Sequence, residues 1–202
     1  MMPTVHILIL AAGASSRMRG ADKLVQPVGQ LPLLRHMVET ALATGAPVTV
    51  TLPPDSPARD RAIAGSPVRI VRVPDAVDGM SRSIVRGIAA LAPEAGPEDG
   101  LMILPADMPA FTAPALSDLI VRFQANPALI FRGGTAGGEP GHPVIFPRDL
   151  WPALSALTGD EGGRSVLRQN EGRVRVIALP GQMTLLDLDT PEDWAAWRAR
   201  RP

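Results

Sequence analysis

The chain of 202 residues contains no cysteine. Without thiols it can form no disulfide bond, no thiolate metal site and no cysteine nucleophile. It also has no tyrosine, only four phenylalanines and three tryptophans, so an aromatic platform for single-stranded nucleic acid is not expected. Basic and acidic residues number 20 each, which gives a net charge of zero. With no overall basic field to attract nucleic acid, an anionic ligand must be bound by a local arrangement of charges.

Long hydrophobic runs are missing as well. The longest apolar run near the start, Val5 to Ala12, is far shorter than the roughly 20 residues that a membrane span needs. No Lys or Arg precedes this run, unlike the charged start of a secretory signal. Together with the lack of cysteine, these features predict a cytoplasmic protein with neither a membrane nor nucleic acid as partner. Proline (22) and glycine (19) are frequent, but less so than in low-complexity sequence.

Short apolar segments alternate with segments of helical periodicity, which predicts an α/β fold with a mostly parallel sheet and right-handed crossovers. Val5–Leu10 and Leu101–Leu104 are almost continuously hydrophobic, as is typical of central strands covered on both faces. Val68–Val73 alternates between apolar and polar residues and is expected nearer an edge. Further strands are predicted at Pro47–Leu52, Leu129–Arg132, Val144–Phe146, Val174–Leu179 and Thr184–Leu188.

Seven helices are predicted, at Pro32–Ala43, Pro57–Ala64, Ser81–Leu91, Pro114–Gln124, Leu150–Leu157, Arg164–Gln169 and Pro191–Arg200. The last has a clear start signal, because Thr190 precedes a proline and two acidic residues. Between Phe131 and Phe146, glycine, proline and short strands replace the helices, and we expect a β-rich insertion or an antiparallel edge there. Since no repeat or long linker divides the chain, residues 1–202 are expected to form a single domain.

Polar and glycine-rich segments follow several predicted strands, where open parallel sheets bind their ligands. After the first strand, the small residues 11–16 would let backbone amides approach a phosphate closely. Arg17 and Lys23 add positive charge there. An ordinary strand-to-helix turn followed by two solvent-exposed basic side chains explains the spacing of residues 11–23 about equally well. Neither a Walker motif nor a G-x-G-x-x-G fingerprint occurs in the sequence.

Four other segments carry candidate ligand-binding residues. Gly79 precedes a helix start with two serines, although a serine that only caps the helix is the simpler explanation. Asp107 directly follows a buried strand between two prolines and suits Mg²⁺, which takes one or two carboxylates and completes its shell with water and phosphate. In the glycine-rich loop 137–143, His142 is a candidate substrate contact, although a lone histidine is more often structural. Asp187 and Asp189 precede the capped last helix, and one of them is expected to face the ligand.

Three motifs together resemble a known family: Leu-Ala-Ala-Gly-x-Ser-x-Arg-Met with a following Asp-Lys (residues 10–23), Leu-Pro-x-Asp-Met-Pro (104–109) and Asp-x-Asp-Thr-Pro-Glu-Asp (187–193). They are similar to motifs of the nucleotidyltransferases that make the dinucleotide form of molybdopterin. The closer match is to the cytidylyltransferase branch of this family, and it rests on residues 11–13, 79–83, 140–144 and 159–164. The motifs occur in the family's order from residue 7 to about 194.

The resemblance implies a three-layer α/β/α sandwich with a Rossmann-like sheet of the nucleotide-diphospho-sugar-transferase type. The implied reaction is Mg²⁺-dependent transfer of CMP from CTP to the phosphate of molybdopterin, the molybdenum cofactor, with release of pyrophosphate. A recipient molybdoenzyme or its chaperone is a further implied partner. Three alternatives stay open: guanylyl transfer to the same cofactor, nucleotidyl transfer to another sugar or alcohol phosphate, and a non-catalytic carrier of a pterin cofactor.

The resemblance also assigns roles to residues of this chain. The catalytic residues are Lys23, Arg17 and Asp107, and the metal ligands are Asp107 and Asp189. The nucleotide is bound by Ala11, Ala12, Gly13, Lys23, Asp78, Gly79 and Ser83, and the acceptor by Gly141, His142 and Arg164. Arg19 stands where the family usually has glycine, and an added phosphate contact is one hypothesis for it.

A general base is not required for this reaction. A phosphate monoester has a second pKa of about 6, so it is largely a dianion near neutral pH and can attack the α-phosphorus unaided. The protein then has to align two anions and neutralise them. His142 is therefore interpreted as a substrate-loop residue. A methyl group at Ala12, where the guanylyl branch has a second glycine, favours a pyrimidine base.

Overall fold

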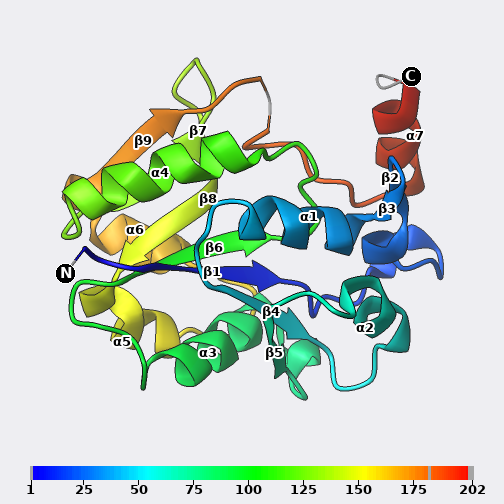
Figure 1. Cartoon of the computed structure of the whole chain (residues 1–202), viewed down its shortest axis with the longest axis horizontal. Helices are drawn as coiled ribbons and strands as arrows, with labels where there is room; N and C mark the ends of the chain where they lie inside the picture. The colour runs from blue at the N-terminus through cyan, green and yellow to red at the C-terminus, as the bar shows by residue number, and fades with distance from the viewer. Residues whose placement is uncertain (1, 182, 200–202) are drawn as a thin grey trace.

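The computed structural model describes residues 2–181 and 183–199 (Figure 1). Its centre is a seven-stranded sheet in the order β5-β4-β1-β6-β8-β7-β9. The strands are β1 (Val5–Leu10), β4 (Val48–Leu52), β5 (Arg69–Arg72), β6 (Gly100–Pro105), β7 (Ile130–Gly134), β8 (Pro140–Pro147) and β9 (Val174–Ala178). All neighbouring strands are parallel except the two pairs that β8 makes. A separate short pair is formed by β2 (Pro27–Val28) and β3 (Leu31–Pro32).

Helices cover both faces of the sheet. One face packs against α1 (Leu33–Leu42), α2 (Pro57–Ile63), α4 (Ala113–Ala125) and α7 (Pro191–Ala199), and the other against α3 (Met80–Leu91), α5 (Trp151–Ser155) and α6 (Arg164–Gln169). The sheet separates two apolar cores, because alternate residues of a strand point to opposite faces: Ile7 and Ile9 belong to the first core and Leu8 to the second. The predicted three-layer α/β/α sandwich with a mostly parallel sheet is therefore confirmed.

The positions of three strands follow their sequence patterns. β1 and β6 lie side by side in the middle of the sheet, and every residue of each except the last is buried. This confirms that the two most continuously hydrophobic segments are central. β5 forms one edge, with three of its four residues exposed, as its alternating pattern predicted.

One expectation was wrong and one is narrowed, and both concern the second half of the sheet. Thr184–Leu188 is not a strand: its described backbone forms turns and irregular structure. It makes isolated hydrogen bonds to two different segments, with the Thr184 carbonyl accepting from the His142 amide and the Leu188 amide donating to the Asp107 carbonyl. Of the two alternatives for residues 131–146, an antiparallel edge is excluded, because the antiparallel strand β8 lies inside the sheet between β6 and β7. The apolar end of β8, residues 143–147, is buried, which requires neighbours on both sides.

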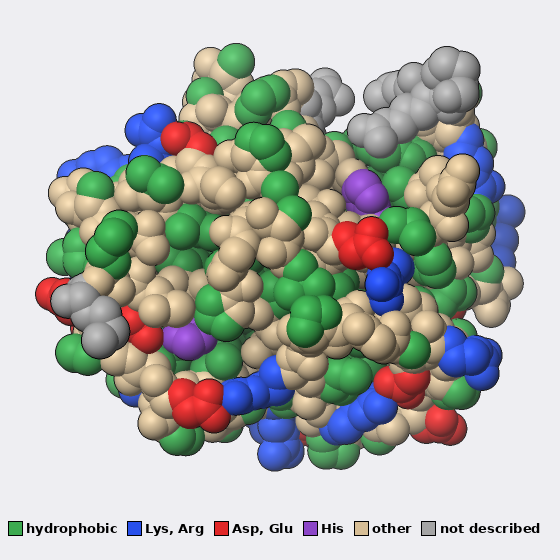
Figure 2. All heavy atoms as spheres, in the orientation of Figure 1, with side chains coloured by type: hydrophobic (Ala, Val, Ile, Leu, Met, Phe, Trp, Pro, Cys, Tyr) green, Lys and Arg blue, Asp and Glu red, His purple; other side chains and the backbone are tan. Residues whose placement is uncertain are grey.

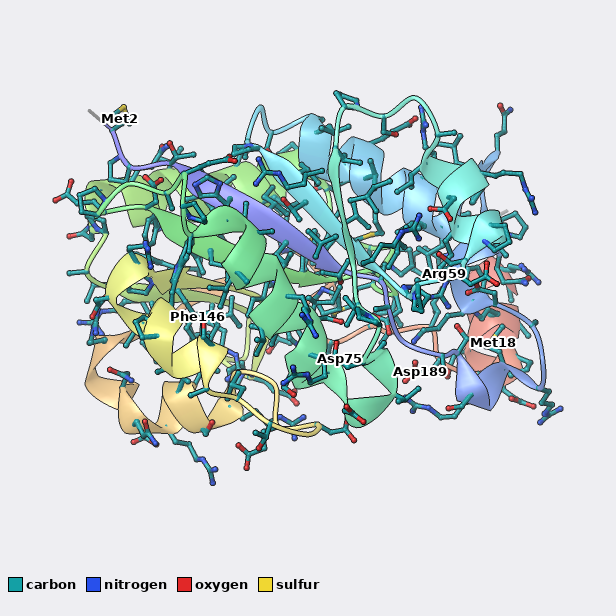
Figure 3. All side chains as sticks on the ribbon, turned by 90° about the horizontal axis from the view of Figure 1, so that it is seen from below. Met2, Met18, Arg59, Asp75, Phe146 and Asp189 are labelled. Atoms are coloured by element: carbon teal, nitrogen blue, oxygen red, sulfur yellow. The ribbon has the colours of Figure 1, made fainter. Side chains whose placement is uncertain are left out.

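The strand order places several loops together. Because β8 is antiparallel to both β6 and β7, these two strands run in the same direction. The carboxyl ends of β1, β6 and β7 and the start of β8 therefore lie at the same end of the strands. Helix α7 lies at this end of the molecule, beside β2 and β3 (Figure 1). Figure 3 shows Met18, Arg59 and Asp189 gathered here, far from Met2 at the opposite end. The site is built at this edge.

Acidic and basic side chains are interspersed with apolar and neutral ones over the face shown in Figure 2. None of the helices in residues 2–181 and 183–199 has the length and apolar character needed to cross a membrane.

Candidate active site

The loop that follows β1 offers unoccupied backbone amides. Within the described residues, the amides of Ala12, Gly13 and Ala14 have no hydrogen-bond partner. Ala11 and Ala12 are buried, at 1% and 4% exposure, whereas Gly13 and Ala14 are exposed, so the accessible part of the loop lies at residues 13 and 14. Successive free amides in a loop are well suited to bind an anion.

Arg19 shows why its position favours glycine. Its φ is 52°, in the left-handed region that glycine enters at little cost. The Arg19 guanidinium lies 2.7 Å from the Glu192 carboxylate, and the Arg19 side chain is 75% exposed. Arg19 therefore links the loop to the start of α7, and its charge is already paired.

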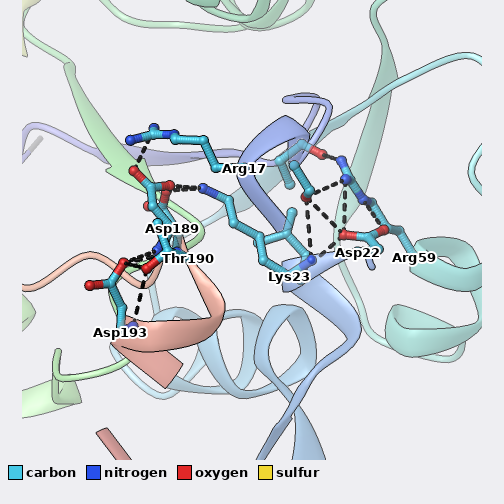
Figure 4. Close-up of polar contacts among 11 residues, drawn as sticks. Arg17, Asp22, Lys23, Arg59, Asp189, Thr190 and Asp193 are labelled. Carbon is cyan, nitrogen blue, oxygen red and sulfur yellow. Dashed lines mark hydrogen bonds and ion pairs between the residues drawn. The ribbon is translucent and has the colours of Figure 1, made fainter. Parts of the chain in front are cut away.

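Lys23 joins the two predicted metal ligands directly (Figure 4). Its Nζ donates to Asp107 Oδ2 at 2.6 Å and to Asp189 Oδ1 at 2.5 Å. Arg17 Nη2 lies 2.5 Å from the other oxygen of Asp189. Burial lowers the pKa of Lys23, but the charges of Asp107 and Asp189 outweigh it and raise that pKa. Three segments far apart in sequence thus converge on one ammonium group.

Lys23 also stands out in composition. It is the only lysine among the 20 basic residues of the chain, and the other 19 are arginines. Lysine carries a compact charge on a flexible stem, whereas arginine carries a planar fork. An ammonium fits between two carboxylates and can move to a phosphate.

The donor set at this point fits a divalent cation. Asp107 and Asp189 already share one cation. Burial, and then the charges of Asp189 and Asp107, raise the pKa of nearby Asp187. No group of three or more His, Cys, Asp or Glu in the described part of the chain could hold a metal alone. Two carboxylates completed by water and phosphate are a usual environment for Mg²⁺. The residues therefore suit a metal that arrives with a triphosphate.

The start of α7 fixes the position of Asp189. Thr190 Oγ1 accepts from the Asp193 amide at 3.1 Å, and Asp193 Oδ2 accepts from the amides of Thr190 and Asp189 at 2.8 and 3.2 Å. This reciprocal arrangement is a capping box, as the sequence predicted for Thr190. Because the same carboxylate holds the Asp189 amide, the cap also orients the carboxylate that contacts Lys23.

The amino end of α3 is closed by another loop. The Met80 amide donates to Asp160 Oδ1 at 3.2 Å and the Ser81 amide to the Gly159 carbonyl at 3.1 Å. Gly79 has a φ of +110°, and a Cβ there would lie 2.5 Å from the Gly159 carbonyl. Glycine is therefore required at position 79 for close contact with the 159–160 loop, and the first amides of α3 are not free for an anion.

Asp75 and Asp78 differ in their surroundings. Asp75 pairs with Arg82 and Arg86, and the hydrogen bond from Arg86 is the main cause that lowers its pKa to about 2. Asp78 is exposed, its amide donates to the Asp75 carbonyl, and its carboxylate has no partner in the residues that the structure describes. Of the two carboxylates, Asp78 is the one free to meet a ligand. Ser83, one turn into α3, is buried at 5% exposure.

A second charged group surrounds the start of β8. The His142 amide donates to the Thr184 carbonyl at 3.0 Å, and a Cβ at Gly141 would lie 2.1 Å from that carbonyl, so this close approach requires glycine. Burial, and then the charge of Arg132, lower the pKa of His142 to about 4, and the charge of Arg164 acts in the same direction. His142 is therefore neutral near pH 7, and its buried Nδ1 has no partner among the described residues.

Two arginines of the site were missed from the sequence. Arg132 donates from Nε to the Gly141 carbonyl at 2.8 Å, and Arg59 donates to the loop after β1. Arg59 is separated by 37 residues from Asp22, its ionic partner, and lies on a short helix with no recognisable motif. The only available signal was its place in the first turn of a predicted helix beside the sheet edge.

Two hollows lie at opposite ends of the molecule. One of about 210 Å³ borders the loop after β1 and is lined by Ala14, Ser15, Ser16, Gly20, Ala21, Asp22 and Arg59. The larger, of about 310 Å³, is lined by residues 2–5, 44–47 and part of α4. Only the smaller hollow adjoins the polar cluster.

Free loop amides, Lys23, Asp107 and Asp189 thus lie together at the carboxyl end of a mostly parallel sheet, where open sheets of this kind bind their ligands. The match to the family described as "MobA-like NTP transferase domain" covers residues 7–174. The chain belongs to this family, and it is a nucleotidyltransferase of the MobA-like type. This confirms the resemblance at the level of the family, while the cytidylyltransferase branch stays a prediction.

Known proteins of similar length agree in fold. Nicotine blue oxidoreductase of Paenarthrobacter nicotinovorans is 29% identical over 95% of both chains. Rv0371c of Mycobacterium tuberculosis superposes with a TM-score of 0.83 at 27% identity over 97% of both chains, and it has also been solved in complex with manganese. A CMP:2-keto-3-deoxy-manno-octonic acid synthetase solved with CTP gives a TM-score of 0.74 over 98% of both chains at 18% identity, a likeness that shows the fold alone.

Proposed function

We propose that this protein transfers CMP from CTP to the terminal phosphate of molybdopterin, with Mg²⁺, to form molybdopterin cytosine dinucleotide and pyrophosphate. The observation that carries the proposal is the shared contact of Lys23 with Asp107 and Asp189, next to a loop with three free amides. In the proposal, residues 1–202 form one transferase domain with a β insertion around 131–146. The reaction takes place in the cytoplasm, and the product passes to a molybdoenzyme or its chaperone.

The nucleotide half of the site aligns and neutralises the triphosphate. The amides of Ala12 and Gly13 donate to phosphate oxygens, and Lys23 and Arg17 supply positive charge as negative charge develops on the leaving pyrophosphate. Asp107 and Asp189 would hold Mg²⁺, which withdraws charge from the phosphates when bound. Asp78, Gly79 and Ser83 form the nucleoside side, with Asp78 the carboxylate free to accept a hydrogen bond.

The acceptor half binds the second anion. Arg164 and the loop of Gly141 and His142 receive the molybdopterin phosphate, and neutral His142 can donate a hydrogen bond without titrating near pH 7. The charge of Asp107 also acts on His142, which supports the view that both halves serve one reaction centre. The acceptor dianion attacks in line with the pyrophosphate, so alignment supplies most of the rate gain.

The choice of base is proposed to depend on Ala12. Its methyl group leaves less room beside the base than a second glycine would, which favours cytosine over guanine. Ala12 is 4% exposed, so only a small part of its surface can meet a base directly.

A second candidate function has one observation in its favour. The relative that matches 95% of this chain is named an oxidoreductase, so an oxidation or reduction reaction is an alternative. Against it, the sequence lacks the G-x-G-x-x-G fingerprint of dinucleotide binding. Oxidation of NADH or NADPH by the purified protein would favour this alternative.

A nucleotide panel tests the proposed function. The protein is incubated with molybdopterin, Mg²⁺ and each of CTP, GTP, ATP and UTP, and pyrophosphate and the dinucleotide product are measured. We expect pyrophosphate only with molybdopterin present, and fastest with CTP. Asp107→Ala should lower the rate on the order of 10²-fold or more, whereas Asp118→Ala, on the exposed side of α4, should not. Equal rates with CTP and GTP would contradict the base assignment, and no pyrophosphate with any nucleotide would contradict the function.

A further inference from the structure

Arg59 is a buried arginine that contacts the nucleotide-binding loop at three points. It is 4% exposed. Its Nη1 donates to the Ala11 carbonyl at 2.7 Å, and its Nη2 to Ser15 Oγ at 3.3 Å. Its Nε and Nη2 donate to the two carboxylate oxygens of Asp22 at 2.7 and 3.0 Å. One guanidinium from α2 thus binds the beginning, the middle and the end of the loop (Figure 4).

These contacts extend to Lys23. Asp22 Oδ1 accepts from the Leu24 amide at 3.0 Å and caps the short 3₁₀ turn Lys23–Val25. Ser15 Oγ accepts from the Lys23 amide at 3.3 Å. The two acceptors that hold the backbone at Lys23 are therefore themselves held by Arg59. A planar guanidinium with five donors can make such a set of bonds, and an ammonium cannot.

The charge of Arg59 is already neutralised. Burial raises the pKa of Asp22, but the hydrogen bonds and charge of Arg59 outweigh it and lower that pKa. Both Asp22 oxygens face the guanidinium, so Arg59 has little net charge left for a phosphate. Its effect on a ligand must come from the shape that it gives to the loop.

We propose that Arg59 is a positioning residue for the nucleoside triphosphate. It holds the free amides of Ala12 and Gly13 and the ammonium of Lys23 in one fixed arrangement before the nucleotide binds. Preorganisation of this kind strengthens binding, because the ligand does not have to order the loop. The proposal rests on the proposed function of the loop as a nucleotide site, and it adds a residue outside the motifs that define that site.

The test compares three variants on one helix. Binding of CTP with Mg²⁺ is measured by calorimetry for the wild type, Arg59→Gln, Arg59→Lys and the control Arg61→Ala, with circular dichroism to verify folding. Arg61 is exposed on α2. We expect Arg59→Gln to weaken CTP binding about tenfold or more. Arg59→Lys keeps the charge opposite Asp22 and should recover thermal stability, but not CTP affinity. Arg61→Ala should bind CTP as the wild type does.

Kinetics separate positioning from a purely structural role. In the folded Arg59 variants, KM for CTP should rise while KM for molybdopterin stays within about twofold. Lowered melting temperature with unchanged CTP affinity would overturn the proposal. If Arg59→Gln does not fold, Asp22→Asn serves instead, since it weakens the same contacts without leaving a buried vacancy, and wild-type CTP affinity in that variant would also overturn it. Failure of the wild type to bind any nucleoside triphosphate would instead refute the proposed function.

Discussion

Lys23 illustrates how single residues define this site. Its ammonium occupies the position between Asp107 and Asp189 that the sequence assigned to a metal ion. Both descriptions hold if Lys23 neutralises the carboxylates in the free protein and moves to the triphosphate when nucleotide and metal bind together. The flexible stem of lysine permits such a movement.

A metal-binding measurement tests this exchange. Lys23→Met removes the ammonium that competes for the two carboxylates, so Mn²⁺ affinity without nucleotide should rise on the order of tenfold, about 1.4 kcal/mol. Calorimetry with Mn²⁺ alone measures it. Arg19→Met is the matched control, because Arg19 lies in the same loop but pairs with Glu192. Equal Mn²⁺ affinity in Lys23→Met and the wild type would show that the ammonium does not compete with a metal ion for Asp107 and Asp189.

His142 provides a second test at the residue scale. Its pKa is lowered to about 4 from 6.5, chiefly by burial. The unfolded chain therefore binds a proton that the folded chain does not between about pH 6.5 and 4. The free energy of unfolding should fall as pH drops through this range.

Ring NMR signals of His142 and urea unfolding at pH 7 and pH 4.5 measure these effects. The ring should titrate near pH 4. The variant His142→Gln should lose less stability between the two pH values than the wild type. A ring that titrates near 6.5, or equal pH dependence in both proteins, would contradict the described burial.

At the scale of elements, the start of α7 connects stability to the site. Thr190 caps the helix, and its partner Asp193 also accepts from the Asp189 amide. Thr190→Ala should lower the free energy of unfolding by about 0.5–2 kcal/mol, measured by urea denaturation. The same variant should bind CTP with Mg²⁺ more weakly, because Asp189 loses part of its support. If Thr190→Ala changes neither the free energy of unfolding nor the affinity for CTP, the cap is not coupled to the site.

The elements also show what the sequence could predict. β1, β6 and the α7 cap followed from local signals: a continuous apolar run, and a threonine before proline and acids. Thr184–Leu188 was misread as a strand because it is mostly apolar. Thr184 and Leu188 are buried, but the segment pairs with no strand of the sheet. The internal place of β8 depends on pairing between segments distant in sequence, which local patterns do not encode.

The residues of the site likewise include some that local motifs predicted and some that depend on tertiary contacts. The motifs brought Lys23, Arg17, Asp107 and Asp189 into view, and the structure places these four in contact. Arg59 could not be found, because its role comes from a tertiary approach of α2 to the loop. The contact of Gly159 and Asp160 with the first amides of α3 could not be predicted either, because it joins segments about 80 residues apart.

At the scale of the whole molecule, the central claim is that one triphosphate lies between the carboxyl ends of β1 and β6. These strands are neighbours, with Leu10 opposite Pro105, so the loop amides and Asp107 face the same space. On one side of this space lies Lys23, bound to Asp107 and Asp189. On the other side lie His142 and Arg164. A single nucleotide there would be in reach of an acceptor bound by the second group.

A crystal structure of the protein with CTP and Mn²⁺ tests this claim most directly. Mn²⁺ is located by its anomalous signal, which separates it from water and Lys23. We predict Mn²⁺ bound by Asp107 and Asp189, with the triphosphate on the amides of Ala12 and Gly13 and on Nζ of Lys23. CTP or Mn²⁺ bound elsewhere, with the Lys23 contacts to both aspartates intact, would contradict the account.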